Sequence, residues 1–194
     1  MSLFLKSIAR ALGWSAAASV LGICALLVSA YVASRQVDEA ILAVEEAKES
    51  VATLEDLRQA TADLILAAMD TIVDKTDTNI LEERVTIMKE ALAKLEAARP
   101  IVRDLAGKAG SPESADKFEE NLVLLTPKAI TDLPRAVREG AAEQVFAALD
   151  DEIDGGGEQI AVALNALKQN RSDALAIAAK AASASVSSAF ENSI

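Results

Sequence analysis

Apolar residues recur every three or four positions along most of the chain beyond residue 36, and this spacing constrains the fold more than any other feature. One such stripe continues for about ten helical turns, with charged residues between its members: Val37, Ile41, Val44, Val51, Leu54, Leu57, Leu64, Ile65, Ala68 and Ile72. This spacing places side chains on one face of an α-helix. Alanine, the strongest helix former, occurs 40 times against 8 glycines and 4 prolines. We therefore predict an all-α fold.

Turn-forming segments divide the pattern into four long helices. The breaks at 74–79 (DKTDTN), 107–112 (GKAGSP) and Gly140 predict helices at about residues 34–76, 79–106, 113–138 and 141–194. Four long amphipathic helices with short connections are typical of an up-down-up-down four-helix bundle.

Prolines and glycines within these helices predict local irregularities. Pro100, Pro127 and Pro134 each lack a backbone N–H and should bend the helix that contains them. Three consecutive glycines at 155–157 weaken the last helix. We interpret them as a distortion within a continuous helix, and a full turn at this point is the alternative.

The segment 11–33 contains no charged residue and is long enough to cross a bilayer as a helix. Lys6 and Arg10 precede it, and cationic residues favour the cytoplasmic side. We therefore expect residues 1–10 in the cytoplasm, a transmembrane helix at 11–33, and residues 34–194 exported. A cleaved signal peptide is the alternative, since Val28-Ser29-Ala30 resembles a cleavage site, but the apolar run is longer than usual for one.

The composition argues against most catalytic and nucleic-acid-binding classes. The chain has no histidine and one cysteine, Cys24, so His-ligated metals, thiolate zinc sites and the common His-dependent catalytic sets are excluded. Its net charge of −11 disfavours binding to phosphate backbones. We expect no enzymatic activity, no cofactor, no metal site and no nucleic-acid partner.

A short basic amino terminus, one apolar span and four exported helices together resemble the sensing half of a methyl-accepting chemotaxis protein. The similar stretches are ADLILAAMDTIVDKTDTNILEER (62–84), VREGAAEQVFAALDDEI (137–153) and ALNALKQNRSDA (163–174). The resemblance implies a periplasmic sensor domain, anchored in a bacterial inner membrane, that signals by small helix displacements. It also implies a second span, a HAMP linker and a cytoplasmic signalling domain, which do not follow here, so we read the chain as a fragment of such a receptor.

Cationic residues on the apolar seams are the candidate ligand-binding residues. Arg58 and Arg99 fall at a similar depth on the first two predicted helices, and Thr61 is another polar seam position. A guanidinium at such a position suits an anionic ligand such as a carboxylate, which it binds with two hydrogen bonds. The alternative is that each arginine reaches the surface and pairs with a nearby acidic residue: Glu55, Asp56, Glu96 or Asp173.

The sequence does not decide which residues of the last predicted helix lie at the same depth as Arg58. Counting from its distal start places residues 158–161 opposite Arg58, whereas counting from the membrane places residues 167–171 there. The second count adds three candidate ligand-binding residues: Lys168, Asn170 and Arg171.

These expectations also suggest the binding partners and the cellular response that the receptor would control. We expect a small-molecule ligand or a periplasmic binding protein, and a homodimer formed through the first helix at Val37, Ile41, Val44 and Val51. Chemotaxis is the leading output, and the sensor module of a histidine kinase or of a diguanylate cyclase is an alternative. A different alternative is a membrane-anchored helical adaptor that is complete at Ile194.

Overall fold

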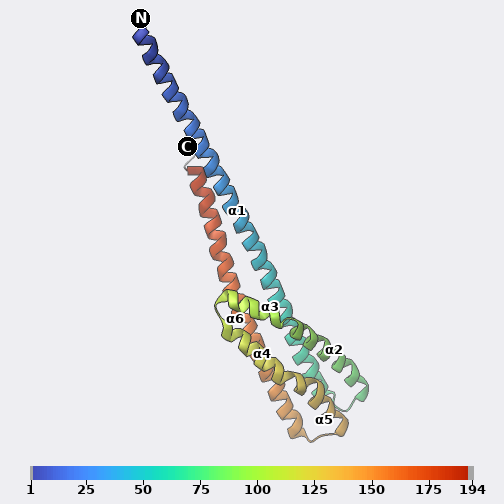
Figure 1. Cartoon of the computed structure of the whole chain (residues 1–194). Coiled ribbons are helices and arrows are strands. Elements are labelled where there is room, and N and C mark those ends of the chain that lie inside the picture. The colour runs from blue at the N-terminus through green and yellow to red at the C-terminus, as the bar shows by residue number, and fades with distance from the viewer. Residues whose placement is uncertain (1, 192–194) are drawn as a thin grey trace. The chain divides into compact units, whose positions relative to one another are not determined.

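The computed structural model describes the backbone of residues 2–191 and the side chains of residues 27–28, 31–32, 34–35, 37–77, 81–181 and 183. Within this part every regular element is helical and there is no strand, which confirms the all-α prediction. The elements, labelled in Figure 1, are α1 (Ser2–Val73), α2 (Thr78–Ala97), α3 (Arg99–Ala109), α4 (Pro112–Pro127), the π-helical turn η1 (Lys128–Asp132), α5 (Leu133–Glu139) and α6 (Glu143–Glu191).

The chain divides into two compact units. Residues 46–175 form the first, here called the core unit, and residues 1–45 and 176–194 form the second. Helices α1 and α6 both contribute to each unit, whereas α2 to α5 belong wholly to the core unit. The chain therefore enters the core unit through α1 and leaves it through α6.

The predicted transmembrane helix at 11–33 lies mostly outside the residues whose side chains are described. The backbone of this segment belongs to α1. Among the described residues, no helix has the length and apolar character needed to span a membrane.

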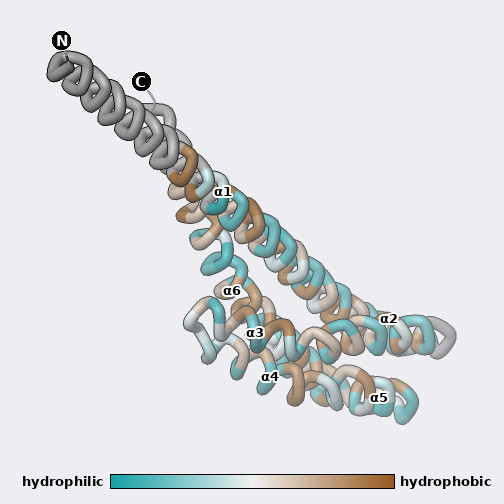
Figure 2. Tube along the Cα trace, turned by 45° about the horizontal axis from the view of Figure 1, so that its top comes forward, coloured by the Kyte–Doolittle hydropathy of each residue, from teal (hydrophilic) through white to brown (hydrophobic). Residues whose placement is uncertain are grey.

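One hydrophobic core holds the core unit together. Leu54 and Leu64 of α1, Met88 of α2, Phe118 of α4 and Ile160 of α6 are all fully buried within it. Burial of a side chain of this size stabilises a fold by roughly 1.5–3 kcal/mol. Figure 2 shows hydrophobic and hydrophilic residues alternating along these helices, as amphipathic helices require.

Glycines in the left-handed conformation end two helices. Gly110 (φ 65°) and Gly140 (φ 61°) follow α3 and α5, and their N–H groups donate to the carbonyls of Gly107 and Val137. A residue with a Cβ is strained at this φ. These turns lie close to the breaks at 107–112 and Gly140 that the sequence predicts.

The prolines bend or divide two of the predicted helices. The run predicted as 79–106 is α2 followed by α3, with the break at Ala98 and Pro100 in the first turn of α3. The run predicted as 113–138 is α4, η1 and α5, with Pro127 before the π-helical turn and Pro134 after it. Single π-helical turns occur inside α-helices, and prolines bend helices. The helical run therefore continues through η1 although both prolines lack an N–H.

The three glycines at 155–157 lie inside a continuous α6, not at a turn. Gly157 is buried against α1: a Cβ built there would be 2.4 Å from Cδ1 and 2.6 Å from Cγ1 of Ile65. A Cβ on Gly156 would be 3.4 Å from Cδ1 of Leu125, in α4. The glycines therefore allow α6 to approach α1 and α4 closely.

Candidate functional site

Two of the predicted ligand-binding residues line a cavity between α1 and α6. The cavity has a volume of about 230 Å³ and is lined from α1 by Arg58, Thr61, Ala62 and Ile65. Its α6 wall is formed by Asp154, Gly157, Glu158 and Ala161. Residues 158–161 therefore face Arg58, as the count from the distal start of α6 predicts, and Lys168, Asn170 and Arg171 are absent from this wall.

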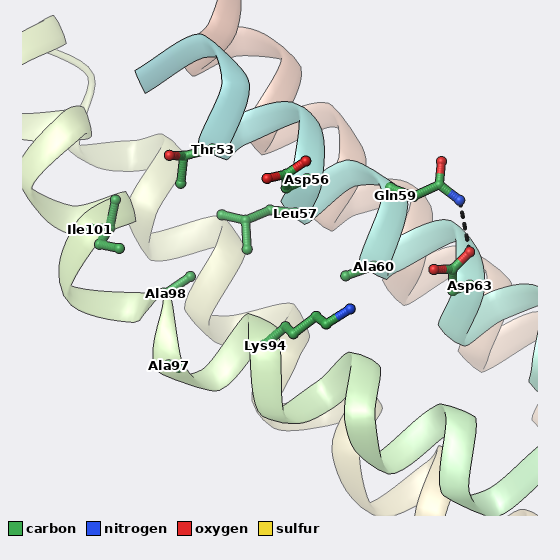
Figure 3. Close-up of a pocket in the computed structure, with 10 residues that line it drawn as sticks. All are labelled: Thr53, Asp56, Leu57, Gln59, Ala60, Asp63, Lys94, Ala97, Ala98 and Ile101. Atoms are coloured by element: carbon green, nitrogen blue, oxygen red, sulfur yellow. Dashed lines mark hydrogen bonds between the residues drawn. The ribbon is translucent and has the colours of Figure 1, made fainter. Parts of the chain in front are cut away.

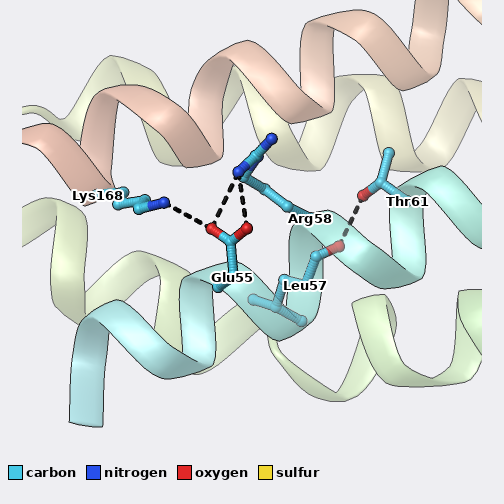
Figure 4. Close-up of polar contacts among 5 residues, drawn as sticks. All are labelled: Glu55, Leu57, Arg58, Thr61 and Lys168. Carbon is cyan, nitrogen blue, oxygen red and sulfur yellow. Dashed lines mark hydrogen bonds and ion pairs between the residues drawn. The ribbon is translucent and has the colours of Figure 1, made fainter. Parts of the chain in front are cut away.

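Arg58 shares an ion-pair cluster with Glu55 and Lys168 at one end of this cavity. Its Nη1 donates to both carboxylate oxygens of Glu55, at 3.0 and 2.9 Å. Lys168 of α6 donates to Oε2 of the same carboxylate at 2.7 Å, and Figure 4 shows the two cations approaching Glu55 from different sides. The cluster therefore ties α1 to α6.

The two cations of this cluster affect the pKa of Glu55. Its pKa is held below the ordinary value of 4.5, mainly by the hydrogen bond from Lys168 and also by that from Arg58, against an opposing effect of partial desolvation. Glu55 therefore carries its negative charge throughout the neutral range.

The Arg58 guanidinium has a buried donor that its neighbours leave unused. Its Nε has no hydrogen-bond partner among the described residues, as is also true of Nε of Arg99 and of Arg171, but of these three arginines only Arg58 lines the cavity between α1 and α6. The Nε–Nη2 edge of arginine is the edge that binds a carboxylate side-on with two hydrogen bonds. Because buried polar atoms are usually paired, this donor is available to an acceptor group in the cavity, whereas the carboxylates of Asp154 and Glu158 on the α6 wall oppose an anion and suit a cationic group.

The Thr61 hydroxyl donates its hydrogen bond within its own helix. Its hydroxyl donates to the carbonyl of Leu57 at 2.9 Å (Figure 4), and only 1% of the residue is exposed. The oxygen keeps its capacity to accept a hydrogen bond, since a hydroxyl has two lone pairs.

Arg99 does not join Arg58. It lies at the start of α3, where its Nη2 donates to Glu96 at 2.8 Å, and it does not line the cavity between α1 and α6. Both arginines pair with acidic residues that the sequence offered as partners, Arg58 with Glu55 and Arg99 with Glu96.

Arg171 belongs to a separate polar cluster at the Glu46 end of the core unit. Its side chain is only 13% exposed, and its Nη2 lies 3.4 Å from Oγ of Ser50 and 3.8 Å from Oε1 of Glu46. Lys108 of α3 donates to Glu46 at 2.7 Å, which lowers the pKa of Glu46 and raises that of Lys108. Asn170, one residue earlier, is exposed.

The predicted dimer residues have side chains that are partly open to solvent. Ile41 is 55% exposed, and Val37, Val44 and Val51 are half-buried. Val51 lies in the core unit and the other three lie in the second unit.

A larger groove, absent from the sequence prediction, runs between α1 and α2–α3. It has a volume of about 610 Å³, and Figure 3 shows Leu57 and Ala60 of α1 facing Lys94, Ala97 and Ala98 across it. The small side chains beside the break at Ala98 leave this space. A pair of alanines just before Pro100 is the only sequence signal for it.

A second groove, of about 560 Å³, separates η1 and α5 from α6. Lys128 bridges it by an ion pair of 2.7 Å with Glu152, and this contact raises the pKa of Lys128. Four of the charged residues that line it therefore already form ion pairs, namely Lys128, Asp132, Arg135 and Glu152.

Comparison with known proteins returned no match to any family model, curated protein or solved structure. The described residues also contain no group of three or more His, Cys, Asp or Glu side chains placed to hold a metal ion.

Proposed function

We propose that this chain is the ligand-sensing region of a transmembrane receptor of the chemotaxis type. In this proposal residues 11–33 anchor it in a bacterial inner membrane, and the exported helices form an up-down-up-down four-helix bundle. The ligand occupies the cavity between α1 and α6, and the protein binds it without converting it.

The observation that carries the proposal is the position of the Arg58 cavity. It is bounded by α1 and α6, the two helices through which the chain enters and leaves the core unit. Next to it, the Glu55–Lys168 ion pair is a direct polar link between these helices. A ligand in the cavity would touch Arg58 on α1 and the α6 wall together, so it would change the contact between α1 and α6, provided that it binds one arrangement more tightly than the other.

Arg58 indicates the chemistry of the ligand. Its unused Nε favours a small molecule with a carboxylate group, and Asp154 and Glu158 on the α6 wall favour one that also carries a cationic group, such as an amino acid. The cavity volume of about 230 Å³ exceeds the roughly 150 Å³ that holds benzene, so a molecule of this size fits. Loss of a charged hydrogen bond to such a ligand costs roughly 1.5–3 kcal/mol, or about ten- to a hundredfold in affinity.

The experiment is a thermal-shift screen of small carboxylates, amino acids included, against the full chain in nanodiscs. We expect at least one of them to raise the melting temperature of the wild type and of the Arg99→Gln variant, but not of Arg58→Gln. Arg99 is the matched control, because it is an arginine in a similar pair with a glutamate three residues earlier and lies outside the cavity. Shifts of equal size in all three proteins would contradict the proposal.

A membrane-anchored adaptor is the second candidate function. It is favoured by large apolar side chains that remain exposed on α1 within the core unit, among them Leu66 and Val73. Exposed apolar patches on an otherwise charged surface commonly mark contacts with other proteins.

A further inference from the structure

Helix α1 has a second apolar face that the hydrophobic core does not use. Ala62, Leu66, Met69 and Val73, here called the outer stripe, follow one another at helical spacing. All four are exposed, with 60% of Leu66 and 78% of Val73 open to solvent. The buried residues of the same segment, such as Leu64 and Ala68, belong to the core on the opposite side of the helix.

Acidic residues border the outer stripe on one side because of the sequence of α1 itself. Ala62, Met69 and Val73 are each followed directly by an aspartate, namely Asp63, Asp70 and Asp74. A step of one residue turns about 100° around a helix, so these carboxylates form one rim of the stripe. Arg84 of α2 pairs with Asp70 and Asp74, whereas Asp63 accepts a hydrogen bond only from the neutral side chain of Gln59.

The other rim comes from α6. Asp154 and Glu158 line the same cavity as Ala62 and Ile65, which places both carboxylates beside the outer stripe. Among the described residues, neither Asp154, Glu158 nor Asp63 forms an ion pair with a lysine or arginine. On one side of the stripe Asp63 keeps an unpaired negative charge, while Arg84 neutralises part of the charge of Asp70 and Asp74. On the other side Asp154 and Glu158 are unpaired near Ala62, in the cavity that Arg58 also lines. The stripe is thus an exposed apolar strip bordered by a net negative charge.

This charge pattern identifies the kind of partner that fits. A second copy of the chain would bring carboxylate rims against carboxylate rims, and like charges across an interface are unfavourable. A helix with apolar residues on one face and lysine or arginine on its flanks would instead bury the strip and neutralise both rims. We propose that the outer stripe is a docking surface for a basic amphipathic helix of another protein.

A synthetic peptide supplies the probe for this surface. It is about five helical turns long, with leucine on one face and lysine on the other, and a matched peptide carries glutamate in place of lysine. Binding to the full chain in nanodiscs of zwitterionic lipid is measured by fluorescence anisotropy, with empty nanodiscs as the blank. We expect the lysine peptide to bind, with an affinity that falls as salt is added, and the glutamate peptide not to bind.

Variants of the protein locate the binding site. Leu66→Ser with Val73→Ser should weaken binding of the lysine peptide at least tenfold, and Asp154→Asn with Glu158→Gln should weaken it and reduce its salt dependence. The matched control is Val123→Ser with Leu124→Ser in α4, where the side chains are similarly exposed at 55% and 59%, and it should bind as the wild type does.

Three outcomes would overturn the docking proposal. They are equal binding of the two peptides, equal losses in the outer-stripe and α4 variants, and self-association of the chain that Leu66→Ser and Val73→Ser abolish. The last would show that a second copy covers the stripe. Asp154 and Glu158 also line the Arg58 cavity, whereas Leu66 and Val73 do not. Loss of peptide binding in Leu66→Ser with Val73→Ser, with the thermal shift by the small ligand retained, therefore separates this proposal from the proposed function.

Discussion

Replacement of Gly157 by alanine tests the close contact between α1 and α6. A Cβ at this position would lie 2.4 Å from Cδ1 and 2.6 Å from Cγ1 of Ile65. Ile65 is β-branched and therefore stiff at χ1, so it cannot easily rotate both atoms away. Either Ile65 adopts a strained rotamer or α6 moves away from α1.

The expected change in the free energy of unfolding combines two opposing contributions. Insertion of a methyl group into a packed contact costs about 1–3 kcal/mol, whereas alanine in place of glycine within a helix gains about 1 kcal/mol. Gly157→Ala should therefore lower the free energy of unfolding by roughly 0–2 kcal/mol. Gly155 has no atom within 4 Å of the position of its added Cβ, so Gly155→Ala should keep the whole gain of about 1 kcal/mol.

The assay is urea unfolding of the full chain, followed by circular dichroism, for both variants and for Gly157→Ala combined with Ile65→Ala. The truncation of Ile65 removes the clashing atoms, so Gly157→Ala should be less harmful in that background than in the wild type. Equal stability of Gly155→Ala and Gly157→Ala, or additive effects of Gly157→Ala and Ile65→Ala, would refute the close-packing argument.

Two further predictions concern the core and the ion pairs. Leu64→Ala, at a fully buried position, should lower the free energy of unfolding by about 2–5 kcal/mol, whereas Leu66→Ala should change it by less than about 0.5 kcal/mol; chemical unfolding curves of the two variants measure this difference. The pKa of Glu55 is lower in the folded chain than its ordinary value of 4.5, so the contact with Lys168 stabilises the fold above that pH and is lost as the pH falls through the folded pKa. The difference in melting temperature between the wild type and Lys168→Gln should accordingly shrink below about pH 4.5, and a difference that is constant with pH would contradict this assignment.

Features with local causes were predictable from the sequence. Helix ends near Gly110 and Gly140 depend on the backbone freedom of a single glycine, and the irregularities at Pro100 and Pro127 depend on a missing N–H. The all-α class followed in the same way from the apolar spacing and the alanine content.

Features that depend on how one helix packs against another were not predictable. The two counts along α6 differed by about two turns, and only the contact between Gly157 and Ile65 fixes the register that places Glu158 near Arg58. The link between Glu55 and Lys168 joins residues 113 positions apart, for which no local pattern exists.

The position of Arg99 was unpredictable for a related reason. Equal depth along two helices does not place two side chains in one cavity, because the face that each presents depends on the break at Ala98. The groove beside Ala98 was not predicted either, because helical periodicity does not give the distance of α2 and α3 from α1.

We propose that ligand binding at Arg58 changes the contact between α1 and α6, and a distance between these two helices tests this directly. The direct measurement is the distance between spin labels at Lys48 and Asn170, two exposed positions of the core unit, in a chain with Cys24 replaced by serine and reconstituted in nanodiscs. The carboxylate with the largest thermal shift is the added ligand. We expect this ligand to shift the distance distribution in the wild type and to leave it unchanged in Arg58→Gln. Saturable binding with an unchanged distribution in the wild type would contradict it.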